Sequence, residues 1–150
     1  MASELHFTRA GSAAALIERH LQECAASLDL ALYRLNHPRL FGALDDAVRR
    51  GVRVRLVLDR NKYDETPATQ QLLAEAQTPF RLLHGRLGPG SKMHHKFAIF
   101  DAATVITGSY NWTVESEEQN YESLLILREA QHVAAFLREF ESLWADAAKL

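Results

Sequence analysis

The stretch S-K-M-H-H-K-F-A-I-F-D, residues 91–101, concentrates ionisable side chains at the start of an apolar run. Successive side chains of a strand point to opposite faces, so His94 and Lys96 should share one face while His95 points to the other. The run is almost entirely apolar after Lys96, as expected of a buried central strand. The stretch therefore predicts a strand whose first residues present a histidine and a lysine side by side.

A second stretch, T-G-S-Y-N at residues 107–111, follows after a short turn. The same alternation puts Ser109 and Asn111 on one side of an extended segment. A nucleophile or base, a fixed cation and two hydrogen-bonding groups could then converge on one anion. The two stretches together point to phosphate chemistry without a metal.

Alternating strand and helix patterns surround these stretches and define the expected fold. Strands are expected at 4–8, 28–35, 52–58, 80–83, 93–101 and 121–127. Helices are expected after Ser12, after Pro38, after Thr66-Pro67 and at the C-terminal end, with a loop at 84–92 and an irregular segment at 112–119. The βαβαβ order implies right-handed crossovers. We therefore expect one α/β domain over residues 1–150, with a mixed, largely parallel sheet covered by helices on both faces.

The composition is that of an ordinary globular domain. Hydrophobic residues make up 47% of the 150 residues, charged residues make up 24%, and the net charge is −2. Such a balance argues against a protein coated in basic charge. The single cysteine, Cys24, rules out an internal disulfide and a cysteine-based zinc site, and its position on an apolar stripe favours a core thiol. No apolar run approaches the ~20 residues of a membrane span, and no secretory signal is visible, so a cytoplasmic location is expected.

Several common catalytic motifs are missing. The sequence has no acidic cluster suited to two magnesium ions, no P-loop and no G-x-S-x-G elbow. A zinc site could be imagined from His84, His94, His95 and Asp59. Because His94 and His95 should face opposite sides of a strand, this zinc site is disfavoured.

The spacing of the polar residues resembles the signature of the phospholipase D superfamily. The matching patterns are H-x-K-x4-D, G-S-x-N and a downstream N-x-E, formed by His94, Lys96, Asp101, Gly108, Ser109, Asn111, Asn120 and Glu122. Among members with one motif copy, the chain is similar to small bacterial endonucleases and to the group of mitochondrial cardiolipin hydrolases and piRNA-pathway nucleases. The resemblance implies a phospholipase D-like fold without a cofactor or metal.

The resemblance also implies a phosphoenzyme mechanism. His94 would attack phosphorus as a neutral imidazole. Lys96 and Asn111, helped by Ser109, would hold the non-bridging oxygens and stabilise developing negative charge. Glu122 would accept the other ring N–H of His94 and fix its tautomer.

A second histidine is needed to protonate the leaving oxygen, and this chain has one motif copy. A twofold homodimer would supply it by placing two copies of His94 across one shared site. The alternative acid, His95, should face away from the site. The sequence therefore favours the homodimer.

The remaining motif residues have structural interpretations. Asp101 ends the buried strand at a turn, where capping of backbone groups is favoured over contact with phosphate. Gly108 belongs to the motif without a functional side chain. Asp59 follows a strand end, where either a ligand contact or simple turn formation would explain it. Candidate substrate contacts near the expected site are Arg60, Lys62, Arg86 and Lys92 on loops, and Trp112, for which packing is the favoured role.

The fold alone does not determine which class of phosphodiester is the substrate. Nucleic acid is favoured, with single strands preferred because few cations surround the site, and because the chain shows no membrane span and no basic amphipathic helix. The alternatives are a phospholipase D or transphosphatidylase acting on phospholipids, and a non-catalytic module for nucleic-acid binding or assembly. The complete set of site residues argues against a module without catalysis.

Overall fold

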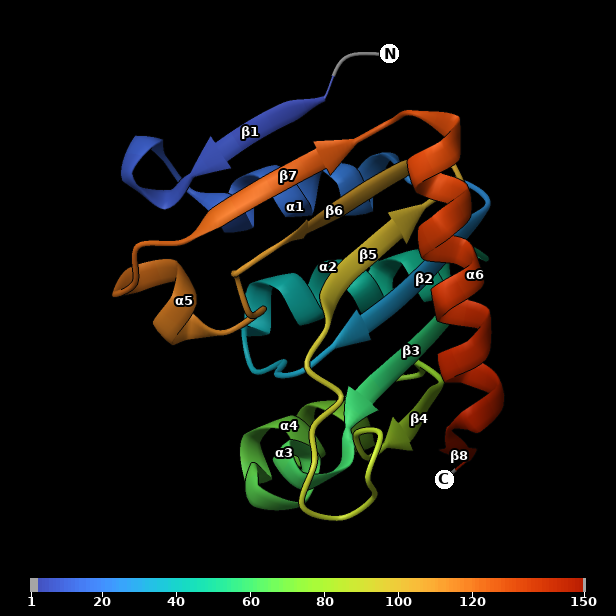
Figure 1. Ribbon diagram of the computed structural model, residues 1–150. Coiled ribbons are helices and arrows are strands. Elements are labelled where there is room, and N and C mark those ends of the chain that lie inside the picture. Colours follow the sequence, from blue (N-terminus) through green and yellow to red (C-terminus); the bar gives the residue numbers. More distant parts are fainter. Residues whose placement is uncertain (1–2, 150) are drawn as a thin grey trace.

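One sheet organises residues 3–149, the part of the chain that the computed structural model describes (Figure 1). Its strand order is β1-β7-β6-β5-β2-β3-β4-β8. The strands are β1 (Glu4–Phe7), β2 (Ser27–Leu32), β3 (Arg53–Asp59), β4 (Phe80–Leu83), β5 (Lys96–Phe100), β6 (Thr104–Gly108), β7 (Ser123–Leu127) and β8 (Ala148–Lys149). The helices are the 3-10 turn η1 (Thr8–Ala10), α1 (Ala13–Glu23), α2 (Pro38–Arg49), α3 (Arg60–Glu65), α4 (Pro67–Ala74), α5 (Val114–Glu118) and α6 (Ala130–Asp146).

The sheet is mixed, but the prediction that it is largely parallel was wrong. Only the pairs β2–β3 and β3–β4 are parallel among the described strands, whereas β5 pairs antiparallel with β2 and β6. The β6–β7, β1–β7 and β4–β8 pairs are also antiparallel. A tight turn joins β5 and β6, a connection that only antiparallel strands allow, whereas the antiparallel β2–β5 pair is a long-range contact that no local pattern specifies.

Two short helices were not expected from the sequence. Both begin at a residue whose side chain caps the first turn: Asp59 accepts from Lys62 N before α3, and Thr113 accepts from Ser116 N before α5. The segment 112–119, expected to be irregular, therefore contains a helix. The caps were visible in the sequence, but helices this short have too little hydrophobic periodicity to predict them.

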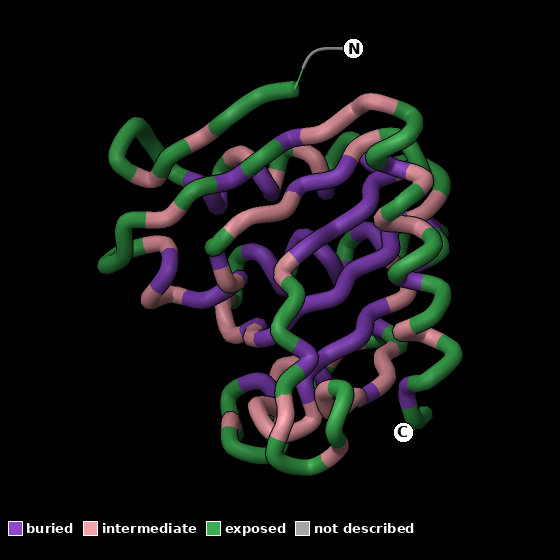
Figure 2. The backbone as a smooth tube through the Cα atoms, in the orientation of Figure 1, coloured by how far each residue is buried: buried purple, intermediate pink, exposed green. Residues whose placement is uncertain are grey.

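Helices cover both faces of the sheet, as expected (Figures 1 and 2). On one face, α1 and α2 pack with alternate residues of the strands into the larger core, which includes Ile17, Leu30, Leu44 and Leu56. On the other face, α6 packs against β2, β4, β5 and β6, and contributes Phe140 to the smaller core. No helix of the described residues is long and apolar enough to cross a membrane.

The β1–β7 end of the sheet is the least covered part of the α6 face. Leu5 is 66% exposed and lies opposite Leu125, which is 39% exposed. Phe7 and Tyr121 are 51% and 80% exposed. We call these four side chains the β1–β7 patch. Apolar side chains gathered in this way mark an interaction surface more often than scattered ones do.

Candidate active site

The polar motif residues meet where β5 begins and β6 ends. Phe97 pairs with Thr107 across β5 and β6, and Gly108 pairs with Leu124 across β6 and β7. Lys96, at the first position of β5, therefore lies at the level where β6 ends and β7 begins. Antiparallel register thus brings together residues that are distant in sequence.

His94 and Lys96 are in direct contact, as the strand alternation predicts. The Lys96 ammonium donates a hydrogen bond of 3.0 Å to the His94 carbonyl. The same ammonium lies 3.3 Å and 3.4 Å from the two ring nitrogens of His94. An ammonium held equally close to both nitrogens disfavours a charged imidazole.

The electrostatics of this pair favour a neutral histidine. Burial, then the charges of Lys96 and Lys92, lower the pKa of His94 below its ordinary value, although Asp59 opposes this. Burial lowers the pKa of Lys96, and the charge of Glu122 partly restores it. His94 is therefore neutral at physiological pH, the form in which a ring nitrogen can attack an electrophile.

His95 lies on the opposite side, as predicted. Its Nε2 is 2.9 Å from a carboxylate oxygen of Glu139 on α6, and its ring meets Phe97 edge-on at 5.2 Å. Its carbonyl accepts a hydrogen bond from Tyr33 N at 2.9 Å, which extends the pairing of β2 and β5 beyond their regular ends. This geometry turns the His95 ring towards α6.

Ser109 and Glu122 form the second side of the site. Ser109 Oγ donates to Glu122 at 2.6 Å and accepts from Ser123 N at 3.0 Å. Asn120 also donates to the Glu122 carboxylate, at 3.1 Å. Among the hydrogen bonds of residues 3–149, none joins Glu122 to His94, so within one protomer the carboxylate holds Ser109 and Asn120.

Gly108 allows β6 to approach β7 closely at this point. Its φ is 151°, and a Cβ at this position would lie 2.1 Å from the carbonyl oxygen of Ser123. Ser109 N donates to that same carbonyl at 3.1 Å. A glycine here is therefore required by backbone contact, which sets the position of Ser109.

Asn111 is partly buried, and its Oδ1 has no hydrogen-bond partner among the described residues. The next residue, Trp112, is 2% exposed and pairs with Leu35 in an isolated bridge. The ring of Trp112 is enclosed in the larger core, which is the packing role favoured for it over a contact with substrate. Packing of this indole anchors the backbone beside Asn111.

Asp101 lies at the far end of β5 from His94. Its carboxylate accepts from the backbone N–H groups of Ala25, Ala26 and Ser27, at distances down to 2.6 Å, and from the thiol of Cys24. These bonds connect the α1–β2 turn to the β5–β6 turn. The contacts are those of the structural role predicted for Asp101.

Two residues outside the motif hold the site in place. Asp59 is fully buried; one carboxylate oxygen accepts from Lys62 N and the other from Met93 N, each at 2.9 Å. The Tyr33 ring meets the His94 ring edge-on at 4.5 Å. In the sequence, Asp59 follows a strand end, where a ligand contact or simple turn formation would explain it, and Tyr33 could line the groove, with packing favoured. The structure brings both side chains to the His94 loop.

The candidate cationic side chains differ in whether they form salt bridges. Arg60 and Lys62 lie on α3 instead of a loop, and they pair with Asp64 and Glu65 at 3.5 Å and 3.1 Å. Arg86 and Lys92 are exposed, and neither has a salt bridge within residues 3–149. An open groove of about 520 Å³ lies between this loop and α6, and it is lined by Arg86, Lys92, His84, His94 and His95, among others.

The described residues contain no group of three or more His, Cys, Asp or Glu side chains arranged to hold a metal ion. The zinc site imagined from the sequence would need Asp59, His94 and His95. Asp59 is committed to two backbone N–H groups, and His95 is turned to Glu139. The ligands are therefore not assembled.

A family model described as "Cardiolipin synthase, PLD-like domain" matches residues 17–144, which include every motif residue discussed above. The chain belongs to the phospholipase D-like family of hydrolases. This confirms the resemblance found in the motifs. The match also covers the elements that carry Tyr33 and Asp59, so these supporting residues lie inside the family domain.

Relatives of known name or structure extend this finding. Human mitochondrial cardiolipin hydrolase is 41% identical over 133 residues, covering 89% of this chain and 51% of that protein. The chain thus spans about half the length of the curated relatives that it matches. The solved structure of Nuc from Salmonella typhimurium, a phospholipase D family member, has a TM-score of 0.87 at 25% identity and covers 99% of this chain and 97% of that one. NucT from Helicobacter pylori has a TM-score of 0.90 at 21% identity, with 99% of both chains covered, which supports the fold.

Proposed function

We propose that this chain is a phosphodiesterase that cleaves nucleic acid, with single strands preferred, through a phosphohistidine on His94. The observation that carries the proposal is the contact between His94 and Lys96. It places a neutral ring nitrogen beside a fixed ammonium, at 3.3 Å and 3.4 Å. A neutral nucleophile next to a cation suits attack on an anionic phosphodiester, because the cation offsets the repulsion.

The proposed reaction has two steps. In the first, a ring nitrogen of His94 forms a bond to phosphorus while the bond to the leaving oxygen breaks, and that oxygen takes a proton from an acid. In the second, water attacks the phosphohistidine, gives a proton to the same group and releases His94. Lys96 and Asn111 stabilise the charge on the non-bridging oxygens, and Ser109 assists after releasing Glu122. Metal ions take part in neither step.

The acid is proposed to be the partner subunit's His94 in a twofold homodimer. Support for this comes from an open groove of about 520 Å³ that joins the β1–β7 patch to the site. Phe7 and Tyr121 line this groove together with Ser109 and Glu122. A second copy seated on the patch would therefore border the catalytic residues, and the isologous contact would repeat at both sites. Glu122 is proposed to orient a histidine once this assembly forms.

The dimer can be tested by the charge variant Phe7→Glu. Phe7 is half exposed, so the variant protomer should still fold. We expect sedimentation to show monomers and turnover to fall in parallel. Leu87→Glu is the matched control, because Leu87 is 92% exposed and lies outside the patch. A fully active monomeric variant would contradict the shared site.

Phospholipid hydrolysis is the second candidate. It is favoured by the name of the 41% identical human relative, a cardiolipin hydrolase. Nucleic acid is favoured by the exposed cations Arg86 and Lys92 beside His94. A cytoplasmic location also remains a prediction from the sequence, whereas the human relative is named as a mitochondrial protein.

The deciding experiment compares substrates in the presence of EDTA. Purified protein is incubated with single- and double-stranded DNA, with single- and double-stranded RNA, and with cardiolipin vesicles. We expect cleavage of single-stranded nucleic acid to persist with EDTA, and His94→Asn to abolish it. Turnover of lipid alone would overturn the nuclease assignment. Loss of activity with EDTA and its recovery with a divalent ion would overturn the metal-free mechanism.

A further inference from the structure

Three lysines surround one aromatic ring beside the nucleophile. The ammonium groups of Lys62, Lys92 and Lys96 lie 5.8 Å, 5.9 Å and 5.4 Å from the centroid of the Tyr33 ring. The ring itself is 7% exposed and touches His94. Cations are attracted to the face of a tyrosine, but three like charges around one ring repel each other. This repulsion would be relieved by a bound anion.

Only one of the three lysines belongs to the motif. Lys96 donates to the His94 carbonyl at 3.0 Å, which holds its ammonium group beside the proposed nucleophile. Lys62 comes from α3, and Lys92 comes from the loop before β5. Their ammonium groups have no hydrogen bond to His94 among the described residues. They therefore form a cationic site beside the one defined by the motif.

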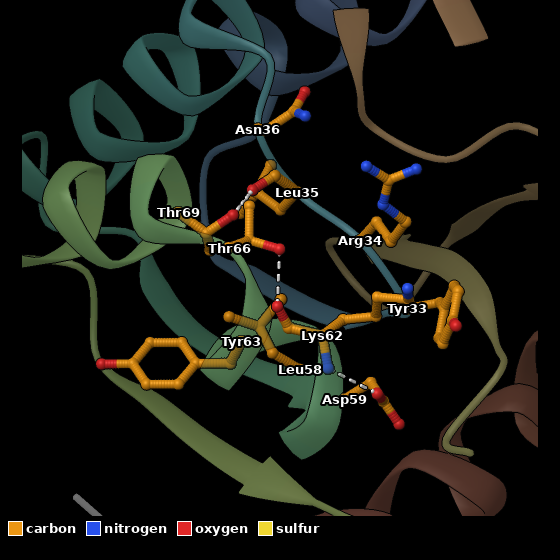
Figure 3. Close-up of a pocket in the computed structure, with 10 residues that line it drawn as sticks. All are labelled: Tyr33, Arg34, Leu35, Asn36, Leu58, Asp59, Lys62, Tyr63, Thr66 and Thr69. Carbon is orange, nitrogen blue, oxygen red and sulfur yellow. Dashed lines mark hydrogen bonds between the residues drawn. The ribbon is translucent and has the colours of Figure 1, made fainter. Parts of the chain in front are cut away.

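Asp59 ties together the backbone segments that carry these two lysines. Its two oxygens accept from the backbone N–H of Lys62 and from that of Met93, the neighbour of Lys92. Figure 3 shows Lys62 and Asp59 at the β3–α3 junction, with Tyr33 alongside. A buried carboxylate with both oxygens occupied by backbone donors holds the chain in place. The two lysines are therefore presented from a rigid base.

Few opposing charges occupy this cluster. Glu65 pairs with Lys62 at 3.1 Å, but its side chain is 61% exposed, and surface pairs of this kind are easily exchanged for another anion. Asp59 is engaged by backbone donors, and the charge of Glu122 acts on Lys96. Arg34, next to Tyr33, is paired with Glu115 at 3.0 Å. Lys92 has no salt bridge within residues 3–149, so its ammonium group is available to an anion.

We propose that Lys62 and Lys92 form a second phosphate subsite, which binds the phosphate adjacent to the scissile one in a polynucleotide. The proposal rests on the nuclease function proposed above and names the feature of the substrate that the chain selects. A single phosphodiester carries one negative charge, for which Lys96 suffices. Two further ammonium groups at the same tyrosine ring match a chain with successive phosphates.

The test compares substrates with one phosphate and with many. Bis(p-nitrophenyl) phosphate has one phosphodiester, and short single-stranded DNA and RNA of one sequence have several. Lys62→Ala/Lys92→Ala should raise KM for the oligonucleotide that is cleaved by about tenfold per lysine, a typical loss for a charged hydrogen bond. The loss with bis(p-nitrophenyl) phosphate should be at least tenfold smaller. Each phosphate contact releases counterions when the nucleic acid binds. The slope of log KM against log salt concentration should therefore also fall by about 0.7 for each lysine that is removed.

Two single variants complete the design. Lys149→Ala removes one positive charge on β8, away from the cluster, and should leave both substrates unaffected. Glu65→Gln frees Lys62 from its pair and should lower KM for the oligonucleotide. Equal losses on both substrates, or an unchanged salt slope, would overturn the subsite while leaving the nuclease function intact. Turnover of bis(p-nitrophenyl) phosphate without cleavage of either nucleic acid would overturn both proposals. Losses confined to cardiolipin vesicles would overturn the assignment to nucleic acid.

Discussion

The two ends of β5 carry one motif but differ in almost every physical respect. At the first end, His94 lines an open groove and contacts Lys96, and burial lowers the pKa of both side chains. At the other end, the Asp101 carboxylate is fully used by the donors of Ala25, Ala26 and Ser27. The first end holds charges that repel each other, and the second has every acceptor matched. The difference teaches that residues of one motif can divide between reactivity and stability.

Replacing His94, the proposed nucleophile, gives the largest expected effect. His94→Asn should lower kcat by a factor on the order of 10^4 to 10^6, as for other covalent nucleophiles. Because the folded state disfavours protonation of His94, its removal should leave the thermal midpoint unchanged or slightly higher. Steady-state kinetics and thermal unfolding of the same samples measure both. His132→Asn, an exposed histidine on α6, is the matched control, and wild-type rates in His94→Asn would refute the site.

Lys96→Ala should have the next largest effect. Losing a donor that stabilises transition-state charge costs about 2.7 kcal/mol or more, roughly a hundredfold in kcat. The pKa of His94 should also rise, since burial and Lys96 are the leading causes of its lowering. NMR titration of the His94 ring measures this shift. A fall in kcat below tenfold, with no movement of the His94 pKa, would separate Lys96 from the reaction.

At the opposite end of the strand, the expected loss is in stability. Asp101→Ala leaves the N–H groups of Ala25, Ala26 and Ser27 without their acceptor, and should lower the free energy of unfolding by about 1–3 kcal/mol. Turnover per folded molecule should remain close to wild type. Chemical denaturation measures the loss of stability, and kinetics at low temperature measure turnover per folded molecule. Asp46→Ala, on the exposed side of α2, is the control, and a selective loss of kcat in Asp101→Ala would return Asp101 to the catalytic set.

The parts of this comparison that depend on nearby residues could be predicted from the sequence. Strand alternation correctly placed His94 and His95 on opposite sides. The position of Asp101 at a turn correctly indicated that its carboxylate binds backbone N–H groups. The Ser12 cap and the helix after Pro38 follow from equally local signals. These interactions span a few residues, so the sequence pattern contains them.

The parts that depend on distant contacts could not be predicted. Asp59 reaches Met93 across more than thirty residues. The direction of the sheet depends on β5 crossing to β2, which no local pattern specifies. The residues around Tyr33 are those expected of a core strand, whether or not its ring contacts that of His94. Tertiary packing decides such cases.

The smallest predicted effect uses acid to separate the two ends of β5. Burial alone would raise the pKa of Asp101, but the N–H donors of Ala26, Ser27 and Ala25 outweigh it and bring the pKa below 3.8. This carboxylate therefore contributes stability above pH 3.8, and the contribution is lost as pH falls through the lower, folded-state pKa. Burial and nearby lysines place the pKa of His94 below 6.5, so the penalty for protonating it begins at a higher pH.

Urea unfolding followed downward from neutral pH should resolve these two windows. The stability gap between wild type and Asp101→Asn should stay constant until the pH approaches 3.8, and then shrink as wild type loses its advantage. The gap between wild type and His94→Asn should instead begin to change near pH 6.5, because wild type loses stability there and the variant does not. A single window shared by both variants would mean that the two ends of β5 titrate as one unit, against the independence that their separate hydrogen-bond networks imply.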